Sequence, residues 1–158
     1  MVDAVEKASL QIRRLSGQTG RPVTYHVTTF GCQMNAHDSE KLRGVLEEAG
    51  CREIDAEDAD IVIYNTCTVR ENADKKVYGR LGRLGAYKKD NPHMVIGLCG
   101  CMMQQSEVAE KIRKSYPFVD MVFGTHNLSD FALLLAKTLE SRKRVFEFGL
   151  EDNSDLYE

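Results

Sequence analysis

Three cysteines occupy positions from which their thiols could bind one soft metal centre. Cys32 follows the apolar run VTYHVTTF, Cys67 follows IVIYN, and Cys101 follows MVIGLCG. The separations of 35 and 34 residues are far too long for a zinc knuckle, but each is about one strand-to-strand cycle of a parallel sheet. Because the carboxyl ends of parallel strands lie on one rim, where open sheets bind ligands, we expect the three thiols to converge.

The residues beside these cysteines narrow the choice of metal. Each cysteine has polar neighbours that could donate hydrogen bonds to sulfur, namely Gln33, Asn35, Asn65, Thr66, Thr68, Gln104 and Gln105. A structural zinc site would need a fourth protein ligand, and of the four histidines only His126, on the loop after the run MVF, is a candidate. Three cysteines fit a 4Fe-4S cluster better, with one iron left open to a non-protein ligand.

The two other cysteines have different expected roles. Cys51 follows the end of a helical segment and so belongs to the opposite rim, where we expect it to be a small buried apolar residue. Cys99 lies inside a strand and is either a core residue or a bystander near the metal site, and we favour the bystander. Five cysteines are an odd set, which favours metal binding or chemistry over a disulfide framework.

Alternating strand and helix patterns supply the frame for these cysteines. Apolar runs rich in β-branched residues begin at Val23, Ile61, Met94 and Met121, with weaker candidates at Cys51 and Val145. Helical periodicity follows each main run, and the first helix has Asp38 or Ser39 as its N-cap and Gly50 as its stop. This alternation predicts a doubly wound α/β fold, with a mainly parallel sheet of about five strands and helices on both faces, as in Rossmann and flavodoxin-like domains.

The composition limits the class of protein. With 158 residues, 42% hydrophobic and 28% charged, the chain is sized for one globular domain. A net charge of −3 argues against a protein that coats nucleic acid over its whole surface. No apolar run is long enough for a membrane span, and the amino-terminal segment is unlike a secretory signal, so we expect a cytoplasmic protein. We place a flexible extension at residues 1–21, the domain at 22–148 and the start of a linker at 149–158.

Three separated motifs carry a resemblance to a known family. They are GCQMNAHDSE from residue 31, NTCTVRENAD from residue 65 and LCGCMMQQ from residue 98, each at a predicted strand end. Together they resemble the amino-terminal domain of the radical-SAM methylthiotransferases, and GCQMN is similar to the tRNA-modifying branch, the MiaB family. Three motifs in this order are specific, whereas any one alone would be a weak signal.

The resemblance implies a cofactor, a substrate and further domains. Cys32, Cys67 and Cys101 would hold an auxiliary 4Fe-4S cluster, and the whole enzyme would methylthiolate C2 of N6-isopentenyladenosine next to the anticodon of tRNA. A sulfur donor is implied, as are a second 4Fe-4S cluster and S-adenosylmethionine bound by a following barrel domain, whose C-x-x-x-C-x-x-C motif does not occur in this sequence. We expect the isolated segment to be monomeric and inactive.

Two questions stay open at this point. A basic stretch at residues 70–89 could contact the tRNA backbone through Lys75, Lys76, Arg80 and Arg83, or it could be an ordinary solvated helix face. A flavodoxin-like electron-transfer module or a structural metal-binding module is the alternative to a sulfur-transfer domain. The flavin alternative would need a hydroxyl-rich phosphate loop after the first strand, which GCQMN does not supply.

Overall fold

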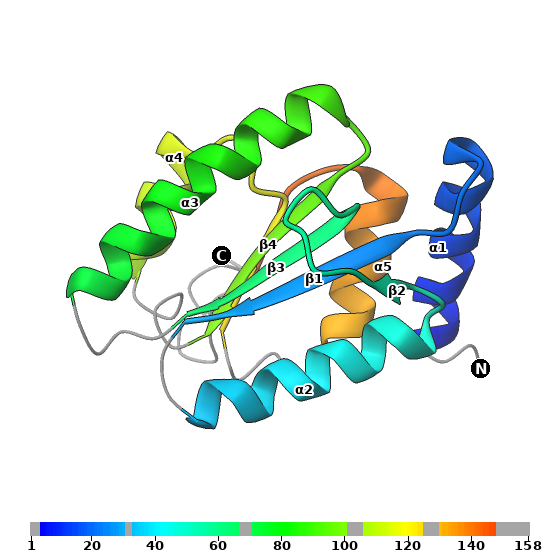
Figure 1. Ribbon diagram of the computed structural model, residues 1–158, viewed down its shortest axis with the longest axis horizontal. Coiled ribbons are helices and arrows are strands. Elements are labelled where there is room, and N and C mark those ends of the chain that lie inside the picture. The colour runs from blue at the N-terminus through cyan, green and yellow to red at the C-terminus, as the bar shows by residue number, and fades with distance from the viewer. Residues whose placement is uncertain (1–3, 31–32, 67–70, 101–105, 125–129, 148–158) are drawn as a thin grey trace, which may run out of the picture.

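The computed structural model describes residues 4–30, 33–66, 71–100, 106–124 and 130–147 of the chain (Figure 1). The helices in these ranges are α1 Ala4–Thr19, α2 Gln33–Glu48, α3 Glu71–Asp90, α4 Ser106–Ser115 and α5 Phe131–Ser141. The strands are β1 Thr24–Thr29, β2 Arg52–Glu53, β3 Ile61–Thr66, β4 Val95–Gly100, β5 Met121–Phe123 and β6 Val145–Glu147. No helix of the described ranges is both long and apolar enough to cross a membrane.

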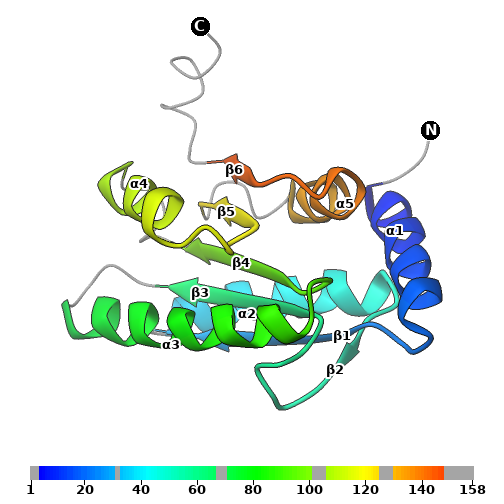
Figure 2. The same cartoon turned by 90° about the horizontal axis from the view of Figure 1, so that it is seen from above.

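All these strands run parallel in one sheet, in the order β2-β1-β3-β4-β5-β6 (Figure 2). The first five follow the flavodoxin-like order, which confirms the doubly wound α/β class. The sheet has six strands where about five were expected, because the short run at Val145 does pair with β5. A run of three residues carries too little pattern to be assigned from sequence alone. The weak strand after Cys51 is confirmed as the edge strand β2.

Helices cover both faces of the sheet, with α1, α2 and α5 on one side and α3 and α4 on the other (Figure 1). Successive strand residues point to opposite faces, so Ile63 belongs to the first core and Val62 and Tyr64 belong to the second. The central strands β3 and β4 are buried along their whole length, as expected of parallel strands covered on both sides.

Helix α1 differs from the expectation of a flexible extension before residue 22. Ala8, Ile12 and Leu15 are buried in the same core as Leu135 of α5, and the two helices lie side by side in both views (Figures 1 and 2). Residues 4–19 are therefore part of the packed domain. The spacing of the three apolar residues, at i, i+4 and i+7, is the pattern of an amphipathic helix and is the sequence signal for this packing.

Helix α2 ends where the sequence predicts, but it begins earlier. Gly50 has a φ of 106°, and the hydrogen bonds from Gly50 N and Cys51 N back into the last turn form a Schellman motif, which favours glycine. The helix begins at Gln33, so the prediction of Asp38 or Ser39 as N-cap is wrong. Ser39 instead lies inside the helix and is fully buried, where it has hydrogen-bond partners on the sheet.

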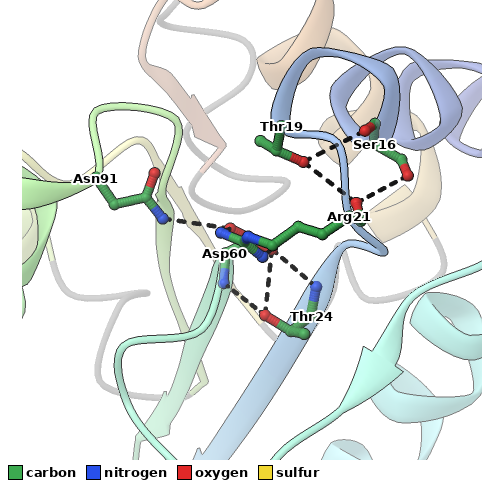
Figure 3. Close-up of polar contacts among 6 residues, drawn as sticks. All are labelled: Ser16, Thr19, Arg21, Thr24, Asp60 and Asn91. Atoms are coloured by element: carbon green, nitrogen blue, oxygen red, sulfur yellow. Dashed lines mark hydrogen bonds and ion pairs between the residues drawn. The ribbon is translucent and has the colours of Figure 1, made fainter.

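The amino-terminal rim of the sheet is closed around Asp60, which directly precedes β3 (Figure 3). Its buried carboxylate accepts hydrogen bonds from both terminal nitrogens of Arg21, at 2.6 and 2.7 Å. Thr24 N, at 3.0 Å, and Asn91 Nδ2, at 3.2 Å, donate to the same group. Burial acts to raise the pKa of Asp60, but the hydrogen bonds outweigh it and hold the pKa below its ordinary value. One carboxylate thus joins three segments of the chain.

Candidate metal site at the carboxyl ends of the strands

Three neighbouring strands end side by side at the carboxyl rim. β1 ends at Thr29, β3 at Thr66 and β4 at Gly100. The register pairs Thr29 with Asn65 and Thr66 with Gly100, so the three ends are nearly level. The sheet order reverses between β1 and β3, and the helices that follow these strands cover opposite faces. This is the switch point at which open α/β sheets bind ligands.

Each of these strand ends leads into a cysteine predicted to bind metal. Cys67 and Cys101 directly follow β3 and β4, and Cys32 follows β1 after two residues. All three lie outside the described residues, as does His126, so ligation stays a prediction. Within the described ranges, no group of three or more histidine, cysteine, aspartate or glutamate side chains could hold a metal ion.

A buried polar cluster lies beneath this rim. Ser39 of α2 shares a hydrogen bond of 2.7 Å with Thr29 Oγ1 and accepts one of 3.1 Å from Asn65 Nδ2. The backbone N–H of Phe30 donates to Asn65 O at 2.8 Å. These bonds tie the end of β1 to the end of β3 and to α2. Sequence reasoning misses this role of Ser39, because a serine near a helix start is also a preferred N-cap.

Gly100 lets β4 approach β3 more closely than another residue would. Its φ is 109°, and a Cβ atom built on it would lie 2.1 Å from Thr66 O and 2.9 Å from Asn65 Oδ1. Both the positive φ and the missing side chain are therefore needed here. The residue before Cys101 thus lies against the residue before Cys67, and the glycine in LCGC is the sequence signal for this approach.

The remaining cysteines are buried and are poor candidates for ligands. Burial raises the pKa of Cys51 to about 12, and burial also raises the pKa of Cys99 above its ordinary value. Both thiols lie in the apolar core, which disfavours the thiolate form that a metal binds. The prediction of a buried Cys51 is confirmed. Cys99 lies in the core with Phe123, so the core alternative is correct and the favoured bystander interpretation is wrong.

Arg80 and Arg83 of α3 line a hollow of about 430 Å³. Acidic side chains of the β2–β3 connection line its other side. Asp55, Glu57 and Asp58 are on its acidic side. Arg80 forms an ion pair with Glu57, and the two side chains are 37% and 12% exposed, so the charge of Arg80 has a partner within the domain. Arg83 is exposed and has no hydrogen bond or ion pair within the described part of the chain.

The rest of the basic stretch does not form one uniform surface. Lys88 Nζ donates to Asp120 Oδ2 at 2.6 Å and to Phe118 O at 3.0 Å, which links α3 to the segment before β5. Lys75 and Lys76 belong to the first half of α3, and their side chains lie outside the described structure. The structure therefore separates bases that hold the domain together from Arg83, which faces solvent.

The fold and the rim together define a doubly wound α/β domain in which three neighbouring strands each lead into a cysteine. The model of the uncharacterized protein family UPF0004 matches residues 24–124, and the chain belongs to this family.

Several proteins similar to this chain bear the same name. A tRNA-2-methylthio-N(6)-dimethylallyladenosine synthase from Lachnoclostridium phytofermentans is 55% identical over 148 residues, which cover 94% of this chain and 32% of the relative. Synthases of the same name from Acetivibrio thermocellus and Clostridioides difficile are 54% and 49% identical, over 82% and 90% of this chain and 27% and 30% of the relatives. The chain thus spans about a third of the length of these curated relatives. The resemblance to the tRNA-modifying branch is confirmed.

Proposed function

We propose that this chain is the amino-terminal, auxiliary-cluster domain of a tRNA-2-methylthio-N6-dimethylallyladenosine synthase. The observation that carries the proposal is the row of three neighbouring strand ends that lead into Cys32, Cys67 and Cys101. The relatives that share this segment bear that activity in their names. In this proposal the complete enzyme methylthiolates C2 of N6-isopentenyladenosine next to the anticodon of its substrate tRNA.

The rim suits three thiolates that bind one cluster. Neighbouring parallel strands lie roughly 4.8 Å apart, so loops that leave three adjacent strands start within reach of a single cluster. The close approach of Gly100 to Thr66 brings two of these starting points together. Thiolates are the ligands that iron-sulfur clusters prefer. The donor set and the order of the strands therefore fit a 4Fe-4S cluster held by three cysteines.

The roles divide between this chain and the rest of the enzyme. When bound, a cluster with three protein ligands supplies one iron that is open to a sulfur ligand. The chain holds the thiolates, and Ser39 and Asn65 fix the strand ends beneath them. A second 4Fe-4S cluster, S-adenosylmethionine and the sulfur donor belong to other parts of the system. We place the enzyme in the cytoplasm and expect this domain to be monomeric.

Anaerobic reconstitution with iron and sulfide tests the assignment. Alanine at Cys32, Cys67 or Cys101 should each abolish stable iron binding, because two thiolates would leave two irons without a protein ligand. Cys99→Ala is the matched control for Cys101→Ala, and Cys51→Ala is the control on the opposite rim; both should bind iron as the wild type does. Normal iron in the Cys101→Ala protein with loss in Cys99→Ala would mean that the third ligand is wrong. Flavin absorption bands, or colourless zinc, would favour the electron-transfer or structural metal alternatives.

We also propose that α3 contacts the tRNA backbone through Lys75, Lys76 and Arg83. The exposure of Arg83 supports this proposal. The sequence also suggests Arg80 as a tRNA contact, but we leave it out because it is paired with Glu57. Glutamate at Lys76 and Arg83 in the complete enzyme should weaken tRNA binding and flatten its salt dependence, because fewer counterions are released. Lys137→Glu, on the helix α5 of the other face, should leave the slope unchanged. An unchanged slope in the α3 variant would identify α3 as an ordinary solvated helix.

A further inference from the structure

Arg80 lies on two aromatic rings, that of Phe30 directly after β1 and that of Tyr64 in β3. Its guanidinium carbon is 5.2 Å from the centre of the Phe30 ring and 5.6 Å from the centre of the Tyr64 ring. The two rings meet edge to face, with their centres 5.1 Å apart. A planar cation within about 6 Å of a ring centre is attracted to the face of the ring. One side chain of α3 therefore contacts the end of β1 and β3 at once.

Glu57 holds the guanidinium in this position. The carboxylate pairs with Arg80, and it accepts hydrogen bonds from Tyr64 OH at 3.1 Å and from Thr28 Oγ1 at 3.4 Å. The Glu57 side chain is 12% exposed and the Arg80 side chain is 37% exposed, so the carboxylate side of the pair is largely shielded from water. A lysine would keep the charge but would lose the planar group that can lie on rings and pair with a carboxylate at the same time.

The two rings stand on the chain that leads into two of the predicted ligands. Phe30 precedes Cys32 by two residues, and Tyr64 precedes Cys67 by three. The backbone bond from Phe30 N to Asn65 O, at 2.8 Å, joins the same two segments. Arg80 itself belongs to the helix that follows Cys67. Three segments that are close to Cys32 or Cys67 in the sequence thus meet at one cation.

We propose that Arg80 is a positioning residue that holds the chain leading into Cys32 against the chain leading into Cys67. The importance of this role for a cluster rests on the proposed function. Among the described residues, the polar and aromatic contacts of Arg80 involve the residue after β1, strand β3 and the connection before β3, and none involves β4. The approach of β4 to β3 depends instead on Gly100. Loss of Arg80 should therefore disturb the approach of Cys32 to Cys67 and leave the approach of Cys67 to Cys101 unchanged.

Cross-linking of the metal-free, reduced chain with a short bifunctional maleimide tests this selectivity. Arg80→Met, which keeps an apolar stem, should slow formation of the Cys32–Cys67 cross-link about fivefold, because the effective concentration of one thiol near the other falls. The Cys67–Cys101 cross-link should form at the wild-type rate. Arg83→Met, one turn away on α3, is the matched control and should change neither rate, and Arg80→Lys should resemble Arg80→Met.

Three outcomes would overturn the proposal. The first is equal slowing of both cross-links, which would indicate a general loosening of the fold, and the second is no slowing of either cross-link. The third is formation of the Cys32–Cys67 cross-link at the wild-type rate in Arg80→Lys. The rate of labelling with a monofunctional maleimide measures the reactivity of each thiol, and each cross-linking rate is corrected for it. Circular dichroism confirms that each variant is folded at the temperature used.

A second measurement uses the reconstituted protein. Iron should pass to a chelator about tenfold faster from Arg80→Met than from the wild type or Arg83→Met, since groups that orient metal ligands typically affect affinity by that factor or more. Equal rates would count against the proposal. If the wild-type chain binds no iron at all, the proposed function fails, and the cross-linking of the metal-free chain alone decides the role of Arg80.

Discussion

At the amino-terminal rim of the sheet, Asp60 is enclosed by donors from two other segments, Arg21 and Thr24 in one and Asn91 in the other (Figure 3). At the carboxyl rim, three strands end shortly before cysteines. The first rim satisfies its buried charge within the described fold. The second has buried polar groups, Ser39 and Asn65, that bond to each other at the strand ends, and it brings two backbones close together at Gly100. Under the proposed function, the metal site lies at the carboxyl ends of the strands, where open α/β sheets bind ligands, and the stabilising ion pair lies at their amino-terminal ends.

The largest effect is expected from a single methyl group at the carboxyl rim. Gly100→Ala would place a Cβ 2.1 Å from Thr66 O at a φ of 109°, so strain and overlap add. We expect the free energy of unfolding to fall by about 2 to 5 kcal/mol and iron binding to be lost. Urea unfolding and iron analysis measure the two effects. Gly79→Ala, where nothing lies within 4 Å, is the control; equal behaviour of the two variants would contradict the close approach.

The next effect is expected at the opposite rim, without loss of iron. Asp60→Asn removes the charge that pairs with Arg21 and leaves buried donors poorly matched. The free energy of unfolding should fall by about 1 to 3 kcal/mol. Asp58→Asn, two residues earlier and exposed, should change it by less than about 0.5 kcal/mol. A stable protein that retains iron after Gly100→Ala but loses it after Asp60→Asn would reverse the comparison of the two rims.

The same carboxylate should make stability depend on pH. Because the pKa of Asp60 is lowered in the folded state, its contribution is complete above the unfolded-state pKa of about 4 and is lost as the pH falls through the folded-state value. Urea unfolding of the wild type and Asp60→Asn should show a constant difference from about pH 5 to 8 and a shrinking one below about pH 4. A difference that persists undiminished to the lowest pH would exclude Asp60 as the responsible group.

Local patterns in the sequence are enough to predict the frame of both rims. Apolar runs and helical periodicity give the parallel sheet, and the position of each cysteine after such a run gives the row of three strand ends. Gly50 is predicted as a helix stop because its role depends on the adjacent turn alone. These features rest on neighbours in the sequence, which is why they can be found without a structure.

Contacts between distant segments could not be predicted. Asp60 meets Arg21 and Asn91, which are 39 and 31 positions away, and Arg80 meets Glu57 across 23 positions. Ser39 has the right residue type for a cap, but tertiary hydrogen bonds place it inside a longer helix. In each case a polar residue has several plausible partners in sequence, and only the packing of helices on the sheet selects one.

The smallest effects are expected along α3, and they show how tightly each part of the helix is packed. Gly82 is exposed, and a Cβ added to it would meet nothing within 4 Å, so Gly82→Ala should raise the free energy of unfolding by about 1 kcal/mol through helix propensity alone.

A Cβ at Gly85 would lie 2.7 Å from the ring of Phe118, on the connection that enters β5 at the amino-terminal rim. Overlap should outweigh propensity there, and Gly85→Ala should lower the free energy of unfolding by about 1 kcal/mol. Phe118→Leu should remove most of that penalty in a double-mutant cycle. Additive effects in the cycle, or a stabilising Gly85→Ala, would show that α3 is packed as loosely at Gly85, near the amino-terminal rim of the sheet, as at the exposed Gly82.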